Sequence, residues 1–362
     1  MSTTTTKLVK GSALRTINLI AKVLVAFFMM PFVVYSLGDR MYGFWTLIGT
    51  FIGYYGLLDF GLSTAVNRYI AGAIGSGSED ECNRIFNTAF ILFIGLGIIV
   101  LFVTVFLVVL TPFLPSNQED AALFAKIILI LGINMAVSFP LKVFSGILEA
   151  QLRFDILSTV QLISLFLRTA FVILVLMLGY KVLALAWVSF LSRIPERVLI
   201  TYLARKNLPY IRFNLKYWRR STARTFLSYG VFVFIAKVMD ILRFHLDAFV
   251  IAAFISLSAV THYRIASLII QYFYRFVFST VGIMQPLFSR LHGAGDYEAI
   301  KTTFFFASNI SIYVASFIGF GLVMWGKPFI EIWMGPVYLD AYPVLVILVL
   351  GVTIALWQAI ST

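Results

Sequence analysis

The sequence predicts an all-α integral membrane protein, a polytopic bundle of helices. Of its 362 residues, 61% are hydrophobic and 12% are charged, whereas soluble domains carry about 25% charged residues. The mean hydropathy is +0.96. Ten segments are apolar and long enough to cross a hydrocarbon core about 30 Å thick, which takes roughly 20 helical residues. Lipid does not tolerate open sheet edges, so each segment is expected to be a helix.

The expected spans follow one another through short connections. They cover residues 12–36, 42–72, 84–112, 121–149, 156–179, 182–204, 222–252, 258–290, 301–325 and 341–362. Several exceed 25 residues, which indicates tilt or extension beyond the bilayer. Several also carry a charged residue near the middle, where a charge costs about 3 kcal/mol. Charges in such places therefore point to a function.

Basic residues in the connections predict a cytoplasmic N-terminus. With that orientation the inside connections hold Lys7, Lys10, Arg84, Arg153, Arg205, Lys206, Arg212, Lys216, Arg219 and Arg220. The outside connections hold only Arg40, Lys181 and Lys327. This asymmetry follows the positive-inside rule and accounts for the net charge of +12 without a nucleic-acid partner. The expected partner is the lipid bilayer.

The longest polar connection, from Arg193 to Arg224, divides the chain into two halves. We expect an N-lobe at residues 1–204, a basic cytoplasmic linker at 205–221 and a C-lobe at 222–362. A weak internal repeat supports this plan, because a shift of 222 residues aligns Arg15 with Lys237, Asn18 with Asp240 and Arg68 with Arg290. Two halves of like orientation are a known transporter plan. On that plan the C-lobe is expected to lack one or more C-terminal helices.

Cations lie deep in several expected spans. Lys22, Arg168, Lys237 and Arg275 come from four different spans, and Arg68 lies near the inner end of a fifth. Buried cations are costly unless water or an anion accompanies them. Phosphate is a natural partner, since Arg binds it through paired N–H donors and Lys as a point charge. These five residues are the candidate substrate-binding residues.

Further polar residues follow helical spacing. Arg15, Asn18 and Lys22 share one face of the first span at i, i+3 and i+7. In the fourth span, Lys142 lies close enough to the inner surface to extend toward the headgroups. Gly49 and Gly53 form a GxxxG pattern that predicts close helix packing.

Deep acids are fewer. Asp59, Asp240 and Asp247, with His245, are candidates for coupling transport to H⁺ or Na⁺. An alternative is that Asp240 and Asp247 only neutralise Lys237 and Arg243 within one helix. Enzyme signatures such as HExxH, a P-loop or GxSxG do not occur in the sequence, and three histidines and one cysteine are too scattered for a zinc site. We therefore expect neither an enzymatic reaction nor a bound metal or cofactor.

Three short motifs carry a family resemblance. They are Tyr42-Gly43-Phe44-Trp45, Leu57-Leu58-Asp59-Phe60-Gly61-Leu62 and Asn67-Arg68-Tyr69-Ile70-Ala71. With the helix layout, they resemble the oligosaccharide flippases of bacterial O-antigen and exopolysaccharide pathways, in the multidrug/oligosaccharidyl-lipid/polysaccharide exporter superfamily. The resemblance covers nearly all of the chain. It implies two lobes around a central cationic cavity, to which Lys22, Arg68, Lys237 and Arg275 would contribute.

The resemblance implies a flippase of the bacterial inner membrane that moves a polyprenyl-diphosphate-linked sugar unit for O-antigen, lipopolysaccharide or another polysaccharide. A polysaccharide polymerase and chain-length machinery would be its partners. A cation-coupled multidrug exporter is an alternative, although cationic drugs would favour deep acids. A membrane-embedded glycosyltransferase or polymerase is a second alternative. Such an enzyme would need a catalytic group in a sizeable outer loop, but the longest outer connection, 327–341, is short. A structural scaffold would leave the deep charges unexplained.

Overall fold

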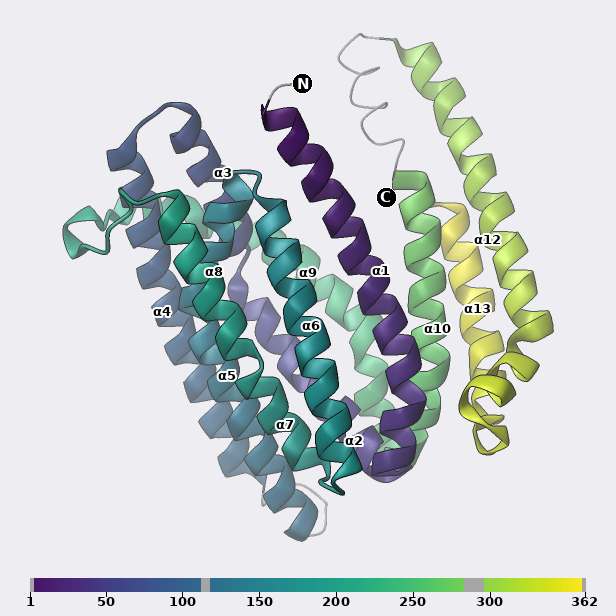
Figure 1. The fold of residues 1–362 in the computed structure, drawn as a ribbon. Helices are drawn as coiled ribbons and strands as arrows, with labels where there is room; N and C mark the ends of the chain where they lie inside the picture. Colours follow the sequence, from purple (N-terminus) through teal and green to yellow (C-terminus); the bar gives the residue numbers. More distant parts are fainter. Residues whose placement is uncertain (1–2, 112–117, 283–295, 360–362) are drawn as a thin grey trace. The chain divides into compact units, whose positions relative to one another are not determined.

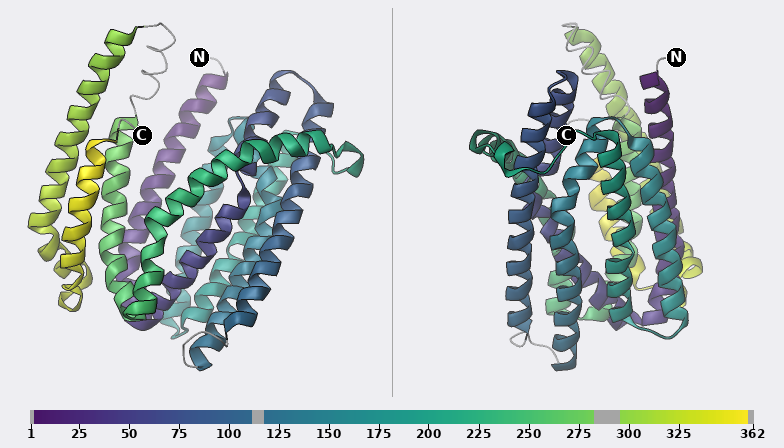
Figure 2. Two further views of the ribbon diagram at one scale, coloured as in Figure 1. Left: turned by 180° about the vertical axis from the view of Figure 1, so that it is seen from behind. Right: turned by 60° about the vertical axis from the view of Figure 1, so that its left-hand side comes forward.

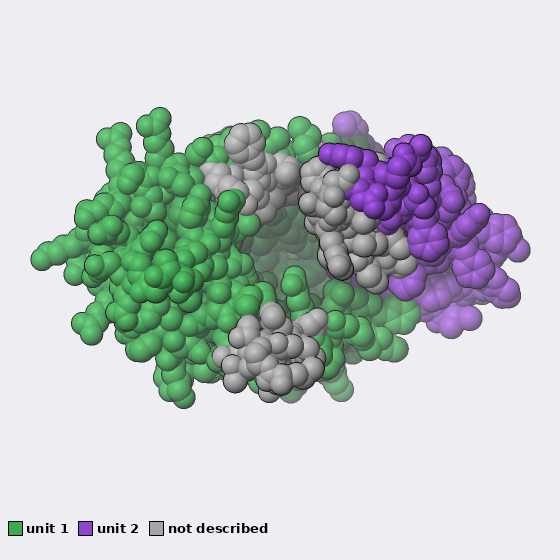
Figure 3. All heavy atoms as spheres, turned by 90° about the horizontal axis from the view of Figure 1, so that it is seen from above, with its two compact units in different colours: residues 1–250 green, residues 251–362 purple. Residues whose placement is uncertain are grey.

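The computed structural model describes residues 3–111, 118–282 and 296–359, and no strand occurs among them. Several side chains within these ranges also lie outside the description, including those of Lys237, Asp240 and His245. The predicted all-α fold is confirmed. The chain divides into two compact units, residues 1–250 and 251–362, shown in two colours in Figure 3. Whether the lobes meet at the basic linker, as the sequence suggests, stays a prediction.

Unit 1 is a bundle of helices that stand side by side (Figures 1 and 2). Its elements are α1 (Thr3–Leu37), α2 (Asp39–Tyr54), η1 (Tyr55–Asp59), α3 (Leu62–Gly75), α4 (Glu79–Leu110), α5 (Gln118–Ala150), α6 (Phe154–Met177), α7 (Val182–Leu191), α8 (Arg193–Asn207), η3 (Leu215–Tyr217) and most of α9 (Arg220–Phe254). Helix α5 contacts α2, α3, α4, α6, α7 and α8, so it is the axis of the unit. Helix α1 packs along α6.

Unit 2 is smaller. It contains α10 (Leu257–Gly282), α12 (Tyr297–Met334), η4 (Pro336–Tyr338) and α13 (Ala341–Trp357). Helix α13 packs against both α10 and α12. Asp296 begins α12 by accepting a hydrogen bond from the backbone N–H of Ala299 at 3.0 Å, as an N-cap residue does.

The surface of the described helices suits lipid. Five helical stretches are long and apolar enough to cross a bilayer: Ala13–Leu37, Glu79–Leu110, Asp120–Ala150, Phe154–Met177 and Tyr297–Met334. Large apolar side chains point outward from them, among them Phe102 and Phe317, which are 71% and 81% exposed. Soluble proteins seldom expose such apolar surface over whole helices. The protein is therefore a multi-pass membrane protein.

The second expected span, 42–72, is not one helix. It is broken into α2 and α3 by the 3₁₀ turn η1 and by two left-handed residues, Phe60 (φ 46°) and Gly61 (φ 68°). Glycine adopts this conformation without the steric cost of a Cβ atom. The break directs the carboxylate of Asp59 into the interior, where only 3% of the residue is exposed.

The closest helix contact lies elsewhere than predicted. A Cβ atom at Gly49 or Gly53 would meet nothing within 4 Å, so the GxxxG pattern makes no close packing within the described residues. A Cβ at Gly97 would instead lie 2.7 Å from the Ala136 carbonyl oxygen, and one at Gly132 would lie 2.2 Å from Thr104 Oγ1. Both glycines let α4 and α5 approach closely.

The structure supports the internal repeat. In unit 1 an ion pair between Arg40 and Asp120 joins the starts of α2 and α5. In unit 2 an ion pair between His262 and Asp340 joins the starts of α10 and α13. The basic members are 222 residues apart, which is the shift found in the sequence, and the acidic members are 220 apart. In unit 2, α13 contacts α10 and α12, as α5 contacts α2 and α4 in unit 1.

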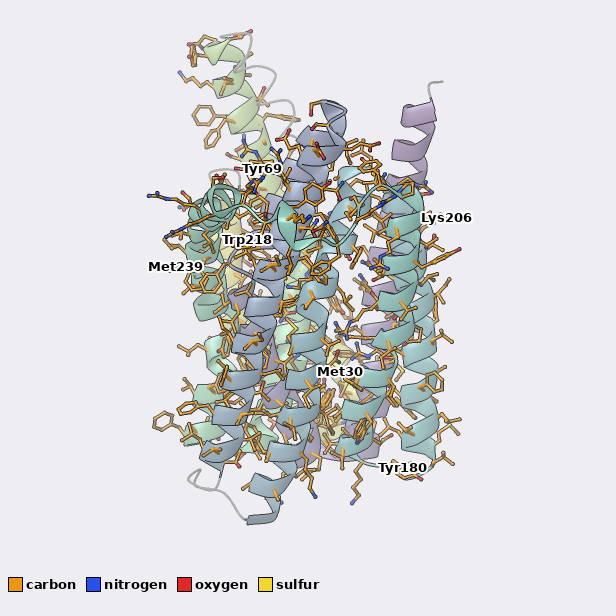
Figure 4. The ribbon with its side chains drawn as sticks, turned by 90° about the vertical axis from the view of Figure 1, so that its left-hand side faces the viewer. Met30, Tyr69, Tyr180, Lys206, Trp218 and Met239 are labelled. Atoms are coloured by element: carbon orange, nitrogen blue, oxygen red, sulfur yellow. The ribbon has the colours of Figure 1, made fainter. Side chains whose placement is uncertain are left out.

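The basic linker is attached to α4 by two buried asparagines. Asn83 donates to the Tyr210 carbonyl at 3.1 Å and accepts from the Arg212 N–H at 2.9 Å. Asn87 repeats the pattern with the Arg212 carbonyl and the Asn214 N–H at 2.9 and 2.8 Å. Figure 4 shows Lys206 and Trp218 toward one end of unit 1 and Tyr180 toward the other. The polar connection predicted from Arg193 is shorter than expected, because α8 extends to Asn207.

The α4–α5 contact allows a test of packing. Thr104 cannot yield easily, since its hydroxyl donates to the Val100 carbonyl at 2.7 Å and pairs with the Tyr55 hydroxyl at 2.9 Å. Gly132→Ala is therefore expected to destabilise the protein by about 1–3 kcal/mol, through overpacking. Gly95→Ala, where a Cβ meets nothing within 4 Å, should be neutral or stabilising. Thermal unfolding in detergent measures both, and equal stability of the two variants would contradict the packing.

Candidate functional site

A cavity of about 670 Å³ lies inside unit 1, between α1 and α6. It is lined by Arg15, Thr16, Asn18, Leu19 and Lys22 of α1, by Asn67 of α3, by Glu149 of α5 and by Phe154, Leu157, Ser158 and Gln161 of α6. The helical spacing of Arg15, Asn18 and Lys22 places all three on this side of α1. The face predicted from the sequence is the face that lines the cavity.

Gln161 holds the polar face of α1 against α6. Its side-chain oxygen accepts hydrogen bonds from Asn18 Nδ2 at 2.8 Å and from Lys22 Nζ at 3.3 Å. Asn18 is only 4% exposed, and its Oδ1 has no hydrogen-bond partner within the described part of the chain. An unpaired buried acceptor is costly, so this amide is suited to a donor from a bound molecule or water.

The charges lining this cavity leave a positive excess. The Arg15 guanidinium lies 5.7 Å from the centre of the Phe154 ring, a cation–π distance. Glu149 accepts a hydrogen bond from Asn67 Nδ2 at 3.0 Å. With Lys22, the lining therefore holds two cations and one carboxylate, a formal charge of +1. Such a lining attracts anions more than cations.

Two smaller cavities of unit 1 share lining residues with their neighbours. One, of about 270 Å³, is lined by Lys22, Trp45, Arg168 and Ser189 among others. The next, of about 300 Å³, shares Trp45, Arg168 and Ser189 and adds Arg193. Lys22 therefore belongs to the first two cavities and Arg168 to the last two. Lys22, Arg168 and Arg193 thus line neighbouring cavities of unit 1.

The structure brings together only some of the predicted residues. Lys22 and Arg168 line the same cavity. Arg68 is exposed on α3, where its neighbour Asn67 reaches the cavity. Arg275 is exposed on α10 of unit 2.

The remaining predicted residues lie on α9. The side chains of Lys237, Asp240 and His245 lie outside the described residues. Asp247 is half-buried. The roles predicted for these four residues stay predictions.

Asp59 and Lys142 form an ion pair inside the bundle. Lys142 Nζ lies 3.3 Å from Asp59 Oδ1 and 4.3 Å from the centre of the Phe139 ring, and Ser63 Oγ donates to the same carboxylate oxygen at 2.8 Å. Lys142, which lies close enough to the inner surface to extend toward the headgroups, instead pairs with Asp59. A buried carboxylate on the neighbouring helix break offers this cation a better partner than the membrane surface does.

Sequence reasoning missed the charged residues at the start of α8. The polar connection predicted from Arg193 overlaps the expected helical span 182–204, and the structure places Arg193, Glu196 and Arg197 on α8, which packs on α5 and α6. Their spacing of i, i+3 and i+4 was the available signal, because it places all three on one helical face. Arg197 donates to Asn134 Oδ1 and Ser138 Oγ of α5, and Ser164 of α6 donates to Glu196 at 2.8 Å.

Comparisons with known proteins point to one family. A family model described as "Polysaccharide biosynthesis protein" matches residues 37–343. The chain is also similar to "Uncharacterized membrane protein EpsK" of Bacillus subtilis (strain 168), with 22% identity over 339 residues, which cover 90% of this chain and 65% of that protein. The chain thus spans slightly less than two thirds of that relative.

Solved structures share the fold. An inward-facing multidrug resistance MATE family transporter of the MOP superfamily matches 93% of this chain and 81% of its own, with a TM-score of 0.72 and 17% identity. A MOP superfamily transporter from Pyrococcus furiosus, described as having a binding pocket of reverse polarity, matches 98% of this chain and 80% of its own. Its TM-score is 0.59 and its identity 16%. At these identities the likeness shows the fold of a MOP superfamily transporter.

The Asp59–Lys142 pair allows a double-mutant test. Lys142→Met should destabilise the protein by about 3–5 kcal/mol, because it removes the counter-charge of a carboxylate that is only 4% exposed, and Asp59→Asn should destabilise it less, because the Lys142 side chain is 29% exposed. The double variant should be much less destabilised than the sum of the two, because both charges are removed together. Unfolding in detergent micelles measures the cycle. Simple additivity would show that the two groups do not interact.

Proposed function

The chain belongs to the family of polysaccharide biosynthesis proteins, and from that premise we propose that it is a flippase for lipid-linked oligosaccharides. Its substrate would be a polyprenyl-diphosphate-linked sugar unit, moved between the leaflets of the bacterial inner membrane without chemical change. The pathway would be the synthesis of O-antigen, of another lipopolysaccharide component or of an exopolysaccharide. A polymerase would then use the translocated sugar unit as its substrate. This proposal rests on the cationic cavities of unit 1.

The position of Lys22 is the main observation that supports this proposal. Lys22 is an exposed residue that lines both the cavity of about 670 Å³ and the cavity of about 270 Å³. With the N-terminus in the cytoplasm, a head group entering from the cytoplasmic side meets Arg15 first and Lys22 one helical heptad deeper. A diphosphate would replace water around both cations and would accept their hydrogen bonds. The apolar tail need not enter, because it remains solvated by lipid.

The other predicted residues take their places in the same proposal. Head-group binding would involve Lys22, Arg68, Arg168, Lys237 and Arg275, and ion coupling would involve Asp59, Asp240, Asp247 and His245. Alternating access then carries the head group from one side to the other. One elementary charge moving through 100 mV supplies about 2.3 kcal/mol, enough to bias a two-state equilibrium. H⁺ or Na⁺ is the proposed coupling ion.

Multidrug export is the second candidate, because it is the description of a structural neighbour. Its usual cationic substrates favour a cavity with an acidic excess. The lining here holds Arg15 and Lys22 against the single carboxylate of Glu149. This sign of charge favours the anionic lipid head group over a cationic drug.

Substitution of Lys22 tests the proposal. Lys22→Gln should lower flipping at least about tenfold and Lys22→Glu should abolish it, because the second also repels phosphate. Lys22→Arg, which keeps the charge, should retain part of the activity. The readout is complementation of a flippase-deficient strain, with membrane insertion checked by protein level.

A matched control is Arg84→Gln, which removes an exposed positive charge from α4. It should complement normally. Leaflet accessibility of a fluorescent polyprenyl-diphosphate oligosaccharide in proteoliposomes measures the activity directly. Full activity of Lys22→Glu in either assay would reject the site.

A further inference from the structure

The cavity of about 300 Å³ is bounded by an arginine cluster from two helices. Arg168 of α6 and Arg193 of α8 line it, together with Trp45 of α2 and with Asn134 and Ser138 of α5. Arg197 lies one turn after Arg193 and donates hydrogen bonds to Asn134 and Ser138. We call Arg168, Arg193 and Arg197 the arginine cluster.

The arginine cluster carries an excess of positive charge. Arg193 lies near enough to Arg168 and to Arg197 to repel both. Glu196 is the carboxylate that attracts both of them. One of its oxygens already accepts a hydrogen bond from Ser164. Three guanidinium groups and one carboxylate leave a formal charge of +2.

The donors of this cluster are not all used. Arg197 donates to α5, but within the described residues no protein group accepts a hydrogen bond from the guanidinium of Arg168 or Arg193. Each guanidinium has five N–H donors. Arg193 is exposed and Arg168 is half-buried, and both line the same cavity. An anion with several acceptor oxygens that enters this cavity could accept hydrogen bonds from both and offset their repulsion.

We propose that the arginine cluster binds a tetrahedral oxyanion of the phosphate type inside unit 1. Arg168 comes from α6 and Arg193 from α8, and each can offer paired N–H donors to two of its oxygens. A cavity of about 300 Å³ accommodates a phosphate group and water but no sugar chain. The site includes Arg168, which the proposed function also assigns to head-group binding, but binding of a free oxyanion there does not depend on flippase activity. Free phosphate and the phosphate of a polyprenyl lipid share the required chemistry.

Thermal unfolding in a phosphate-free maltoside detergent tests the site. Inorganic phosphate, added at constant ionic strength against chloride, should raise the Tm of the wild-type protein in a saturable way, because a ligand that binds only the native state stabilises it. Polyprenyl phosphate in the same micelles forms the second arm. A response to inorganic phosphate identifies the free ion as a ligand, and a response confined to the lipid identifies the head group.

Variants separate binding from a structural role. Without phosphate, Arg193→Gln and Arg168→Gln should raise the Tm, because repulsion within the cluster is relieved. Both should weaken the phosphate response about tenfold or more. A structural role would instead lower the Tm without phosphate. Arg84→Gln, which removes an exposed positive charge away from this cavity, should keep the wild-type response.

Equilibrium dialysis of labelled phosphate against the wild-type protein provides a readout that needs no variant. One bound phosphate per chain is expected. Absence of binding to the wild-type protein in both arms, or an unchanged phosphate response in a folded Arg168→Gln/Arg193→Gln variant, would overturn the proposal.

Discussion

Every charge placed among apolar helices needs compensation, and this constraint organises unit 1. Lys142 is compensated by Asp59, and Lys22 receives a hydrogen-bond acceptor from Gln161. The two partners in each contact come from different elements, so the ion pair links η1 to α5 and the hydrogen bond links α1 to α6. The polar interactions therefore set which faces of α1, α5 and α6 meet, while apolar packing and lipid fill the remainder. The positive excess that is left over is the charge on which the proposed binding sites depend.

Close packing makes these polar pairs possible. Gly97 and Gly132 let α4 and α5 approach until their backbones nearly touch, which holds α5 as a rigid axis. Asn134, Lys142 and Glu149 all project from that axis. The break at Gly61 has a similar effect, since it turns Asp59 inward to meet α5. Backbone irregularity is tolerated in a membrane where protein surrounds it, and here it positions a charge.

Each unit has an ion pair that joins the starts of two helices. An ion pair joins the start of the second expected span to the start of the fourth in unit 1, and its counterpart joins α10 to α13 in unit 2. Arginine keeps its charge at all physiological pH values, whereas histidine is charged only when protonated. The repeat therefore preserves the position of the contact but not its chemistry.

The sequence by itself determined the membrane class, the helical fold, the internal repeat and the face of α1 that carries Arg15, Asn18 and Lys22. Hydropathy and helical periodicity are properties of one segment, so a single sequence reveals them. The partner of Lys142, the break in the second span and the inward face of α8 were decided only by the tertiary structure. Each depends on what a neighbouring helix places opposite, and periodicity specifies which residues share a face without specifying what that face meets.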